Sequence, residues 1–159
     1  MSEHSIEVPD ESRCAFCDYL NARRPYTILW RERRAAVLVT REQRGVAHLL
    51  VIPTRHVPTL LDLRDSEAGD LMIAVRDAAL AIDAAFGRPG VAVWQNNGTS
   101  AHQAIPHLHF HVAGTLPGGG TDFGDVEEQS VAQTDAIGRA LSSAVPPRAA
   151  VGRRVEQRG

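Results

Sequence analysis

The chain has 159 residues, of which 43% are apolar and 23% are charged, as in a globular protein with one buried core. Its formal net charge of -2 argues against a general nucleic-acid binder, and all 17 basic residues are arginine, which excludes chemistry at a lysine amine. No apolar run is long enough to span a membrane, and the polar N-terminus lacks a signal-peptide core. We therefore expect a cytoplasmic protein that binds neither nucleic acid nor membrane.

Two cysteines near the N-terminus have a spacing that is used for metal binding or redox chemistry. Cys14 and Cys17 form a C-x-x-C motif within residues 14–21, which read as a short helical turn. A thioredoxin-type motif should follow a strand, but residues 1–12 show no periodicity and are expected to be flexible. The cysteines are then half of a zinc site, which needs two more ligands, or simply small core residues.

Three strands are predicted after the cysteines, at residues 26–30, 35–39 and 47–53, from their apolar, β-branched and aromatic composition. Pro53 ends the third strand because it cannot donate a hydrogen bond to a neighbouring strand. His48 opens this otherwise apolar strand, and by itself it would be interpreted as a structural histidine.

A long amphipathic helix is predicted over residues 71–86, where apolar side chains recur at spacings of three and four. Asp65 or Ser66 is expected to cap its start, and Gly87 is expected to end it. The apolar face is explained most simply by core packing, and a second use at a subunit interface stays open.

A fourth strand is predicted at residues 90–95, followed by a loop of small and amide residues at 96–104. Such a loop offers backbone N–H groups to a phosphate, although an ordinary Asn-Gly turn would look the same. A final helix is expected within residues 126–145, and residues 146–159 are expected to be a disordered tail. Short connections and one long helix predict an α+β domain over residues 13–145, with an antiparallel sheet and a crossover helix.

Histidine and apolar residues alternate from Pro106 to Gly114, and this stretch organises the rest of the chain. In a strand, His107, His109 and His111 would share one face at intervals of about 6–7 Å. Three interpretations are open: polar alternation on a solvated face, a metal site, or a nucleophilic site. In the last, the middle ring attacks while its neighbours bind anionic oxygens or set the tautomer.

Together these motifs resemble the histidine triad (HIT) superfamily, over roughly residues 14–114. The resemblance rests on the cysteine pair, on the strand led by His48 with His56 eight residues later, and on Gln103 followed by the alternating histidines. It implies a HIT-like fold with about five antiparallel strands, and it implies a homodimer.

The resemblance also implies an activity. HIT-type enzymes are hydrolases or nucleotidyl transferases that cleave at the α-phosphate of nucleoside 5'-phosphate derivatives, so a purine nucleotide-type small molecule would be the substrate. His109 would form a nucleotidyl-histidine intermediate, which water then hydrolyses. His111 would contact phosphate oxygens and help protonate the leaving group, while His48 and His107 complete the catalytic cluster. The alternative is a nucleotide-binding or regulatory module with weak or no turnover.

Substrate contacts and metal ligands follow from the same resemblance. The implied substrate-binding residues are Asn96, Gln103, Ala104 and Thr40. Thr40 stands where many relatives carry a ribose-binding aspartate, Ala104 where many carry a serine, and His102 where a glycine is common. In the cysteine-bearing branch, a structural zinc ion is bound by residues that correspond to Cys14, Cys17, His56 and His107, a closed tetrahedral set. A metal-storage site that uses all the histidines and cysteines is a further hypothesis.

Overall fold

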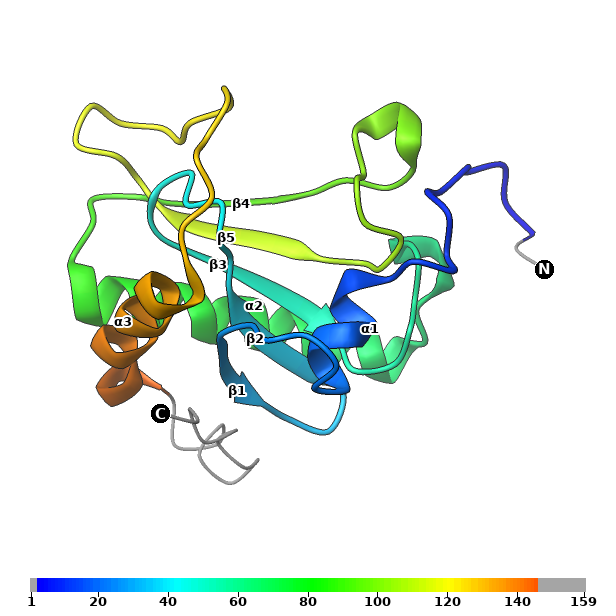
Figure 1. The fold of residues 1–159 in the computed structure, drawn as a ribbon, viewed down its shortest axis with the longest axis horizontal. Coiled ribbons are helices and arrows are strands. Elements are labelled where there is room, and N and C mark those ends of the chain that lie inside the picture. The colour runs from blue at the N-terminus through cyan, green and yellow to red at the C-terminus, as the bar shows by residue number, and fades with distance from the viewer. Residues whose placement is uncertain (1–2, 146–159) are drawn as a thin grey trace.

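The protein is an α+β domain built on one antiparallel sheet, as the sequence predicts (Figure 1). The computed structural model describes residues 3–145, and the predicted tail at 146–159 lies outside them. Its strands are β1 (Ile28–Arg31), β2 (Ala35–Val39), β3 (Val46–Pro53), β4 (Val91–Gln95) and β5 (Phe110–Gly114). Its helices are α1 (Ala15–Leu20), α2 (Asp65–Phe86) and α3 (Val131–Leu141), with short 3-10 turns η1 (Leu60–Asp62), η2 (Thr99–Ala101) and η3 (Ser142–Ala144). The strand order is β1-β2-β3-β5-β4, so the chain crosses the sheet through α2 between β3 and β4.

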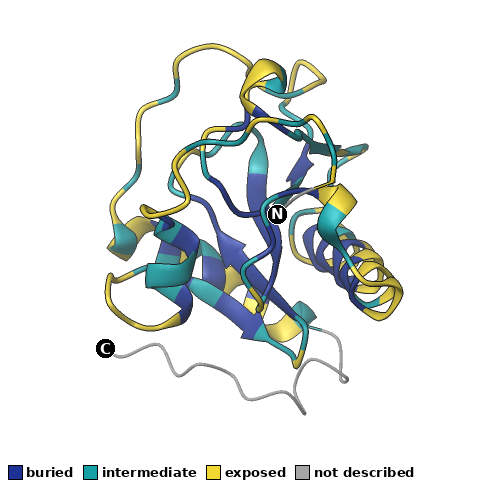
Figure 2. Cartoon of the chain, turned by 90° about the vertical axis from the view of Figure 1, so that its right-hand side faces the viewer, coloured by how far each residue is buried: buried dark blue, intermediate teal, exposed yellow. Residues whose placement is uncertain are grey.

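Helices cover both faces of β2 and β3, and almost every residue of these two strands is therefore buried. Val37, Leu49 and Val51 point to the face that packs against α2. Leu38 and Leu50 point to the opposite face, which packs against α1. Figure 2 shows the buried strands between these layers and α2 seen nearly end-on, with its outer side exposed. The second face continues past α1 as the floor of the functional site.

Helix α2 begins earlier than its apolar pattern suggests, and the predicted caps at Asp65 and Ser66 are wrong. Arg64 is the N-cap residue, and its N–H donates to the Glu67 carboxylate at 3.0 Å. Glu67 also accepts from Arg55 Nε at 2.9 Å and Nη2 at 2.7 Å. A buried carboxylate in the first turn therefore satisfies the helix start, in place of a capping side chain.

The histidine stretch forms a shorter strand than predicted. Strand β5 begins only at Phe110, because the residues before it bond to a loop and not to a neighbouring strand. Leu108 N–H donates to Val57 O at 2.7 Å, and His107 is drawn into a cluster with the cysteines. The alternation of faces survives, since Leu108 and Val112 are both buried in the core on the α2 side.

The segment between β5 and α3 lies across the loop at residues 40–45. Asp122 N–H donates to Arg44 O at 2.7 Å, and Gln129 N–H donates to Arg41 O at 2.8 Å. The Arg41 side chain returns a bond from Nε to Gln129 O at 2.7 Å. These bonds fix the loop that leads into His48. Within residues 3–145, no helix has both the length and the hydrophobicity that a bilayer span requires.

Candidate active site and metal cluster

Two clusters of histidines lie on the α1 side of the sheet, joined through the chain between His107 and His109. The first, here called the Cys/His cluster, contains Cys14, Cys17, His56 and His107, whose ligand atoms all lie within 4.8 Å of one another. The Cys17 Sγ lies 3.2 Å from His56 Nδ1 and 3.5 Å from His107 Nδ1, and the Cys14 Sγ lies 3.4 Å from the latter atom. A tetrahedral zinc ion separates its sulfur and nitrogen ligands by about 3.5 Å, so the donor set fits this ion.

Local structure presents each of these four ligands. Cys14 is the N-cap residue of α1, and its Sγ accepts the Cys17 N–H at 3.2 Å, which turns both sulfur atoms toward one point. His107 Nε2 bonds Pro53 O at 2.9 Å, and His56 Nε2 bonds Glu11 at 3.0 Å. These bonds orient each ring with Nδ1 toward the sulfur atoms. Metal-bound histidines are commonly oriented in this way, by a hydrogen bond to the ring nitrogen that does not bind the metal. Burial raises the pKa of the Cys14 thiol to about 12, an effect that a bound cation would oppose.

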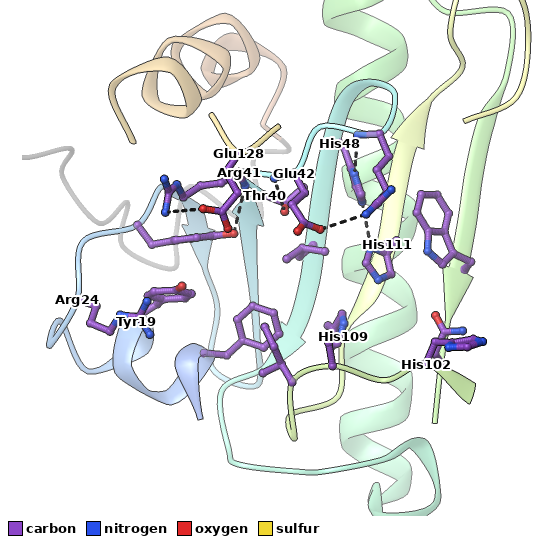
Figure 3. A pocket seen from close by; sticks show the side chains of 18 residues that line it. Tyr19, Arg24, Thr40, Arg41, Glu42, His48, His102, His109, His111 and Glu128 are labelled. Carbon is purple, nitrogen blue, oxygen red and sulfur yellow. Dashed lines mark hydrogen bonds and ion pairs between the residues drawn. The ribbon is translucent and has the colours of Figure 1, made fainter. Parts of the chain in front are cut away.

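The second cluster lines a pocket of about 430 Å³ beside the first (Figure 3). Its floor is the exposed end of the α1 face of the sheet, with side chains from β3, β4 and β5. Its walls come from α1, from the loop at residues 40–45 and from the loop that follows β4. The lining residues that carry the argument are Phe16, Tyr19, Thr40, His48, Trp94, Asn96, His102, Ala104, His109 and His111.

His109 stands in the middle of the pocket wall, with its ring held on two sides. It makes edge contacts with Phe16, at a centroid distance of 5.1 Å, and with His111, at 5.0 Å. Its Nδ1 lies 2.7 Å from His107 O. A carbonyl oxygen only accepts, so Nδ1 carries the proton and Nε2 keeps its lone pair. Burial lowers the pKa of His109 and favours this neutral form.

His48 reaches the pocket because β3 contains a bulge. Ala47 has a φ of 60°, and the pairing with β5 shifts between Val46 and His48. His48 Nδ1 then accepts the Arg44 N–H at 3.2 Å, so its proton sits on Nε2, which lies 3.0 Å from His111 Nδ1. His111 in turn carries its own proton on Nε2. Burial lowers the pKa of His48 to about 4 and that of His111 to about 2, so both rings are neutral at pH 7.

Trp94 completes the wall beside His111. The two residues are direct partners in the β4–β5 ladder, and their rings stack at 4.7 Å with an interplanar angle of 4°. Leu50 on β3 is the partner of His111 on its other side. The ring is therefore confined on both sides by cross-strand neighbours.

A HIT domain model matches residues 21–117, which is more than half of the chain. The chain belongs to the HIT domain family. The recognition of this family from the histidine and cysteine motifs is confirmed, as is the fold class.

Two HIT relatives and one solved structure are similar to this chain. The asymmetrical bis(5'-nucleosyl)-tetraphosphatase of Schizosaccharomyces pombe is 34% identical over 85 residues, which are 54% of this chain and 47% of the relative, so the chain spans about half its length. The adenosine 5'-monophosphoramidase of the same yeast is 30% identical over 99 residues, 62% of this chain and 71% of the relative. A zinc-bound histidine triad family protein from Mycobacterium smegmatis has a TM-score of 0.69 at 22% identity, over 85% of this chain and 94% of that one. The HIT relatives that are similar to this chain thus include one named as a tetraphosphatase and one named as a phosphoramidase.

The structure brings most of the residues implied by the HIT resemblance into one pocket. His48, His109 and His111 line it together with Thr40, Asn96 and Ala104. Two other predicted residues lie behind the pocket wall. His107 is fully buried in the Cys/His cluster, where its carbonyl still touches His109. Gln103 is 3% exposed. Its Oε1 accepts the Gly98 N–H, and its Nε2 donates to Pro58 O and Ile105 O.

Several residues of the HIT pocket were missed in the sequence. Tyr19 and Tyr26 stack at 4.0 Å with an interplanar angle of 14°, and the Arg24 guanidinium lies 5.2 Å from the Tyr19 centroid. Tyr19 and Arg24 lie at the end of the pocket opposite His102 (Figure 3), and Tyr26 also lines the pocket. Of these missed residues, only Trp94 could have been suspected from the sequence. It lies near the end of the strand predicted at residues 90–95, directly before the amide-rich loop. The tyrosines meet only through the packing of α1 beside β1.

Proposed function

We propose that this protein hydrolyses nucleoside 5'-phosphate derivatives at the α-phosphate, with His109 as the nucleophile. The observation that carries this proposal is the bond between His109 Nδ1 and His107 O at 2.7 Å. It fixes the proton on Nδ1 and leaves the Nε2 lone pair available for attack without prior deprotonation. The substrate would be a phosphoramidate or a dinucleoside polyphosphate, which are the substrate classes that the names of two HIT relatives suggest.

The first step forms a bond between His109 Nε2 and the α-phosphorus and breaks the bond from phosphorus to the leaving nitrogen or oxygen. The leaving group departs with the electron pair of the broken bond and takes up a proton from solvent. His111 Nε2–H, the donor that the chain of bonds from Arg44 through His48 assigns to that atom, would stabilise it by a hydrogen bond. Water then attacks the phosphorus, the phosphorus–histidine bond breaks, His109 Nε2 regains its lone pair, and the proton lost by the water passes to solvent. The products are a nucleoside monophosphate and the protonated leaving group.

The substrate is proposed to lie along the pocket with its α-phosphorus at His109. The nucleoside would occupy the end that carries Thr40 and the tyrosines, where aromatic surface suits a base and the threonine hydroxyl can bond the ribose. The phosphate and the leaving group would face Asn96, Ala104 and His102. The lack of a hydroxyl at Ala104 leaves its backbone N–H as the donor there.

The direct test is AMP release from an adenosine 5'-phosphoramidate and from a diadenosine polyphosphate. We expect release by the wild type and a loss of at least a thousandfold in His109→Ala, with the fold retained. His4→Ala is a matched control, because His4 bonds Asp62 outside both clusters. Release by His109→Ala at the rate of the wild type would exclude the mechanism. AMP binding without release by the wild type would instead favour the regulatory nucleotide-binding module, which the absence of an aspartate at Thr40 and of a serine at Ala104 motivates.

We also propose that the Cys/His cluster binds one structural zinc ion. Two thiolates and two imidazoles close the tetrahedral shell and leave no position for a reacting water. The ion would hold α1, the loop at His56 and the segment at His107 together. Since His107 O orients His109, the cluster would support catalysis by positioning its neighbour and would take no part in the chemical steps.

A homodimer is proposed through the outer side of α2 and the edge strand β4. Met72, Leu80 and Val93 are 54%, 55% and 48% exposed, and they would form one apolar surface. Strand β4 pairs only with β5 within the described sheet, so its other edge can accept a second copy of the same strand. Sedimentation should show a dimer for the wild type and a monomer for the double variant Leu80→Glu, Val93→Lys. A monomeric wild type would refute the proposal.

A further inference from the structure

His102 has a backbone conformation that a glycine would adopt more easily. It ends η2 with a φ of 66°, in the left-handed region, and it is one of three residues other than glycine with positive φ among residues 3–145. This conformation costs a side-chain-bearing residue free energy that glycine does not lose. Strained positions of this kind are concentrated at functional sites, so the imidazole calls for an explanation.

The loop that carries His102 is fixed from several sides. His102 N–H donates to Thr99 O at 3.0 Å, and Gln103 N–H donates to Gly98 O at 3.0 Å. The buried Gln103 side chain closes the same turn by accepting the Gly98 N–H at 2.7 Å. From outside, Thr99 N–H donates to Glu7 O at 2.8 Å. The backbone at His102 is thus set by its neighbours, and the residue lines the pocket, so a ligand that its ring contacts would cost little loop entropy on binding.

His102 lies at one end of the pocket, and the tyrosines lie at the other. Figure 3 shows His109 between Tyr19 on one side and His102 on the other. Beside His102 the pocket is lined by Asn96 and Ala104, and Ala104 has no polar side chain. An imidazole N–H donates to anionic oxygen. His102 therefore supplies this end of the pocket with a side-chain donor, which Ala104 lacks.

We propose that His102 is a specificity-determining residue that binds the anionic oxygens of a polyphosphate leaving group. This inference rests on the proposed function, because the nucleoside must occupy the opposite end for the leaving group to reach His102. A dinucleoside polyphosphate expels a nucleotide whose phosphate oxygens can accept from the ring. A phosphoramidate expels an amine, which offers no such oxygens. His102 thus favours polyphosphate substrates over phosphoramidates.

The test compares the wild type with His102→Gly, which removes the ring and also relieves the backbone strain. The ratio of kcat/KM for diadenosine tetraphosphate to that for adenosine 5'-phosphoramidate is expected to fall at least tenfold. Thermal stability should be equal or higher, so misfolding cannot explain the change. Ser100→Gly is the matched control, because Ser100 is an exposed residue of the same loop that does not line the pocket. A ratio within twofold of the wild type would overturn the inference.

A binding measurement separates this inference from the proposed reaction. ADP carries one more phosphate than AMP, at the position that the leaving group would occupy. His102→Gly should lower the ratio of ADP affinity to AMP affinity at least fivefold, whether or not the protein turns over any substrate. An unchanged affinity ratio would refute the role of His102, and release of AMP from neither substrate by the wild type would refute only the hydrolase.

Discussion

His48 Nε2 lies 3.0 Å from His111 Nδ1, and this bond joins two strands at the floor of the pocket. The Arg44 N–H on His48 Nδ1 sets the direction of the bond, with His48 as the donor. Both rings are neutral in this arrangement. Both Nδ1 atoms already accept a hydrogen bond, so a proton added to either one would break that bond. Protonation of either ring therefore destabilises the fold, and its stability depends on pH.

We expect the free energy of unfolding to fall as the pH drops below about 6.5. In the unfolded chain both rings take up protons near pH 6.5, whereas burial holds the pKa of His48 at about 4 and that of His111 at about 2 in the fold. The unfolded state thus binds more protons in this range, so stability is full above pH 6.5 and declines toward the folded values. At pH 5 each ring should lower the free energy of unfolding by about 2 kcal/mol relative to its value at pH 8.

The measurement is a series of urea unfolding curves from pH 8 to pH 5, for the wild type and for His111→Asn. The variant lacks one of the two titrating rings, so its unfolding free energy should depend less steeply on pH. Equal slopes for the two proteins would show that His111 is not held neutral by the fold.

Substitution Glu67→Gln should destabilise the protein by about 2–3 kcal/mol, because it removes a charge from two short bonds to Arg55 and from the N–H of the N-cap residue. The bonds from Arg55 hold the pKa of Glu67 at about 2. The stabilisation is therefore present above about pH 4.5 and is lost as the pH falls toward 2. Thermal melts of both proteins at pH 7 test the first statement. Asp65→Asn, at an exposed position of the same turn, is the control and should change little.

Removal of the metal should lower both stability and activity. We expect one zinc ion per chain, and we expect a strong chelator or Cys17→Ser to lower the melting temperature by ten degrees or more, since structural zinc contributes directly to folding. His109→Ala should keep its zinc, because His109 is not one of the four ligands. Loss of metal from His109→Ala would contradict this assignment and favour a site that uses all the histidines.

The sheet and the long helix could be predicted because their patterns are local. The apolar run along residues 47–53, which Pro53 ends, and the three-four spacing along residues 71–86 are signals of strand and helix that do not depend on tertiary contacts. The late start of β5 could not be predicted, because it depends on the bond from Leu108 N–H to Val57 O, two residues that are far apart in sequence. The bulge at Ala47 likewise depends on pairing with β5.

The histidines of the site could be named from their spacing, whereas their partners could not. Trp94 stacks on His111 only because β4 and β5 pair in one register, which the long loop between them does not reveal. The bond from His56 Nε2 to the Glu11 carboxylate joins a loop to a polar segment without periodicity. Such contacts depend on tertiary packing, so they cannot be predicted from composition and residue spacing.

Gln103 gives the sharpest test of how the pocket loop is held. Its Oε1 accepts from Gly98 N, and its Nε2 donates to Pro58 O at 2.8 Å and to Ile105 O at 2.9 Å. A carboxylate at this buried position could accept the N–H but could not donate to the two carbonyls. Gln103→Glu should therefore lose about 2–4 kcal/mol of unfolding free energy, together with most of kcat, because Ala104 and His102 flank it.

Gln133→Glu is the matched control for Gln103→Glu. Gln133 Oε1 accepts the Ser130 N–H at 2.8 Å in the capping box of α3, which is a role that a glutamate fills equally well. Urea midpoints and kcat measured for both variants should separate them clearly, with no loss in the control. A Gln103→Glu protein as stable as this control would mean that the loop is held by its backbone bonds alone.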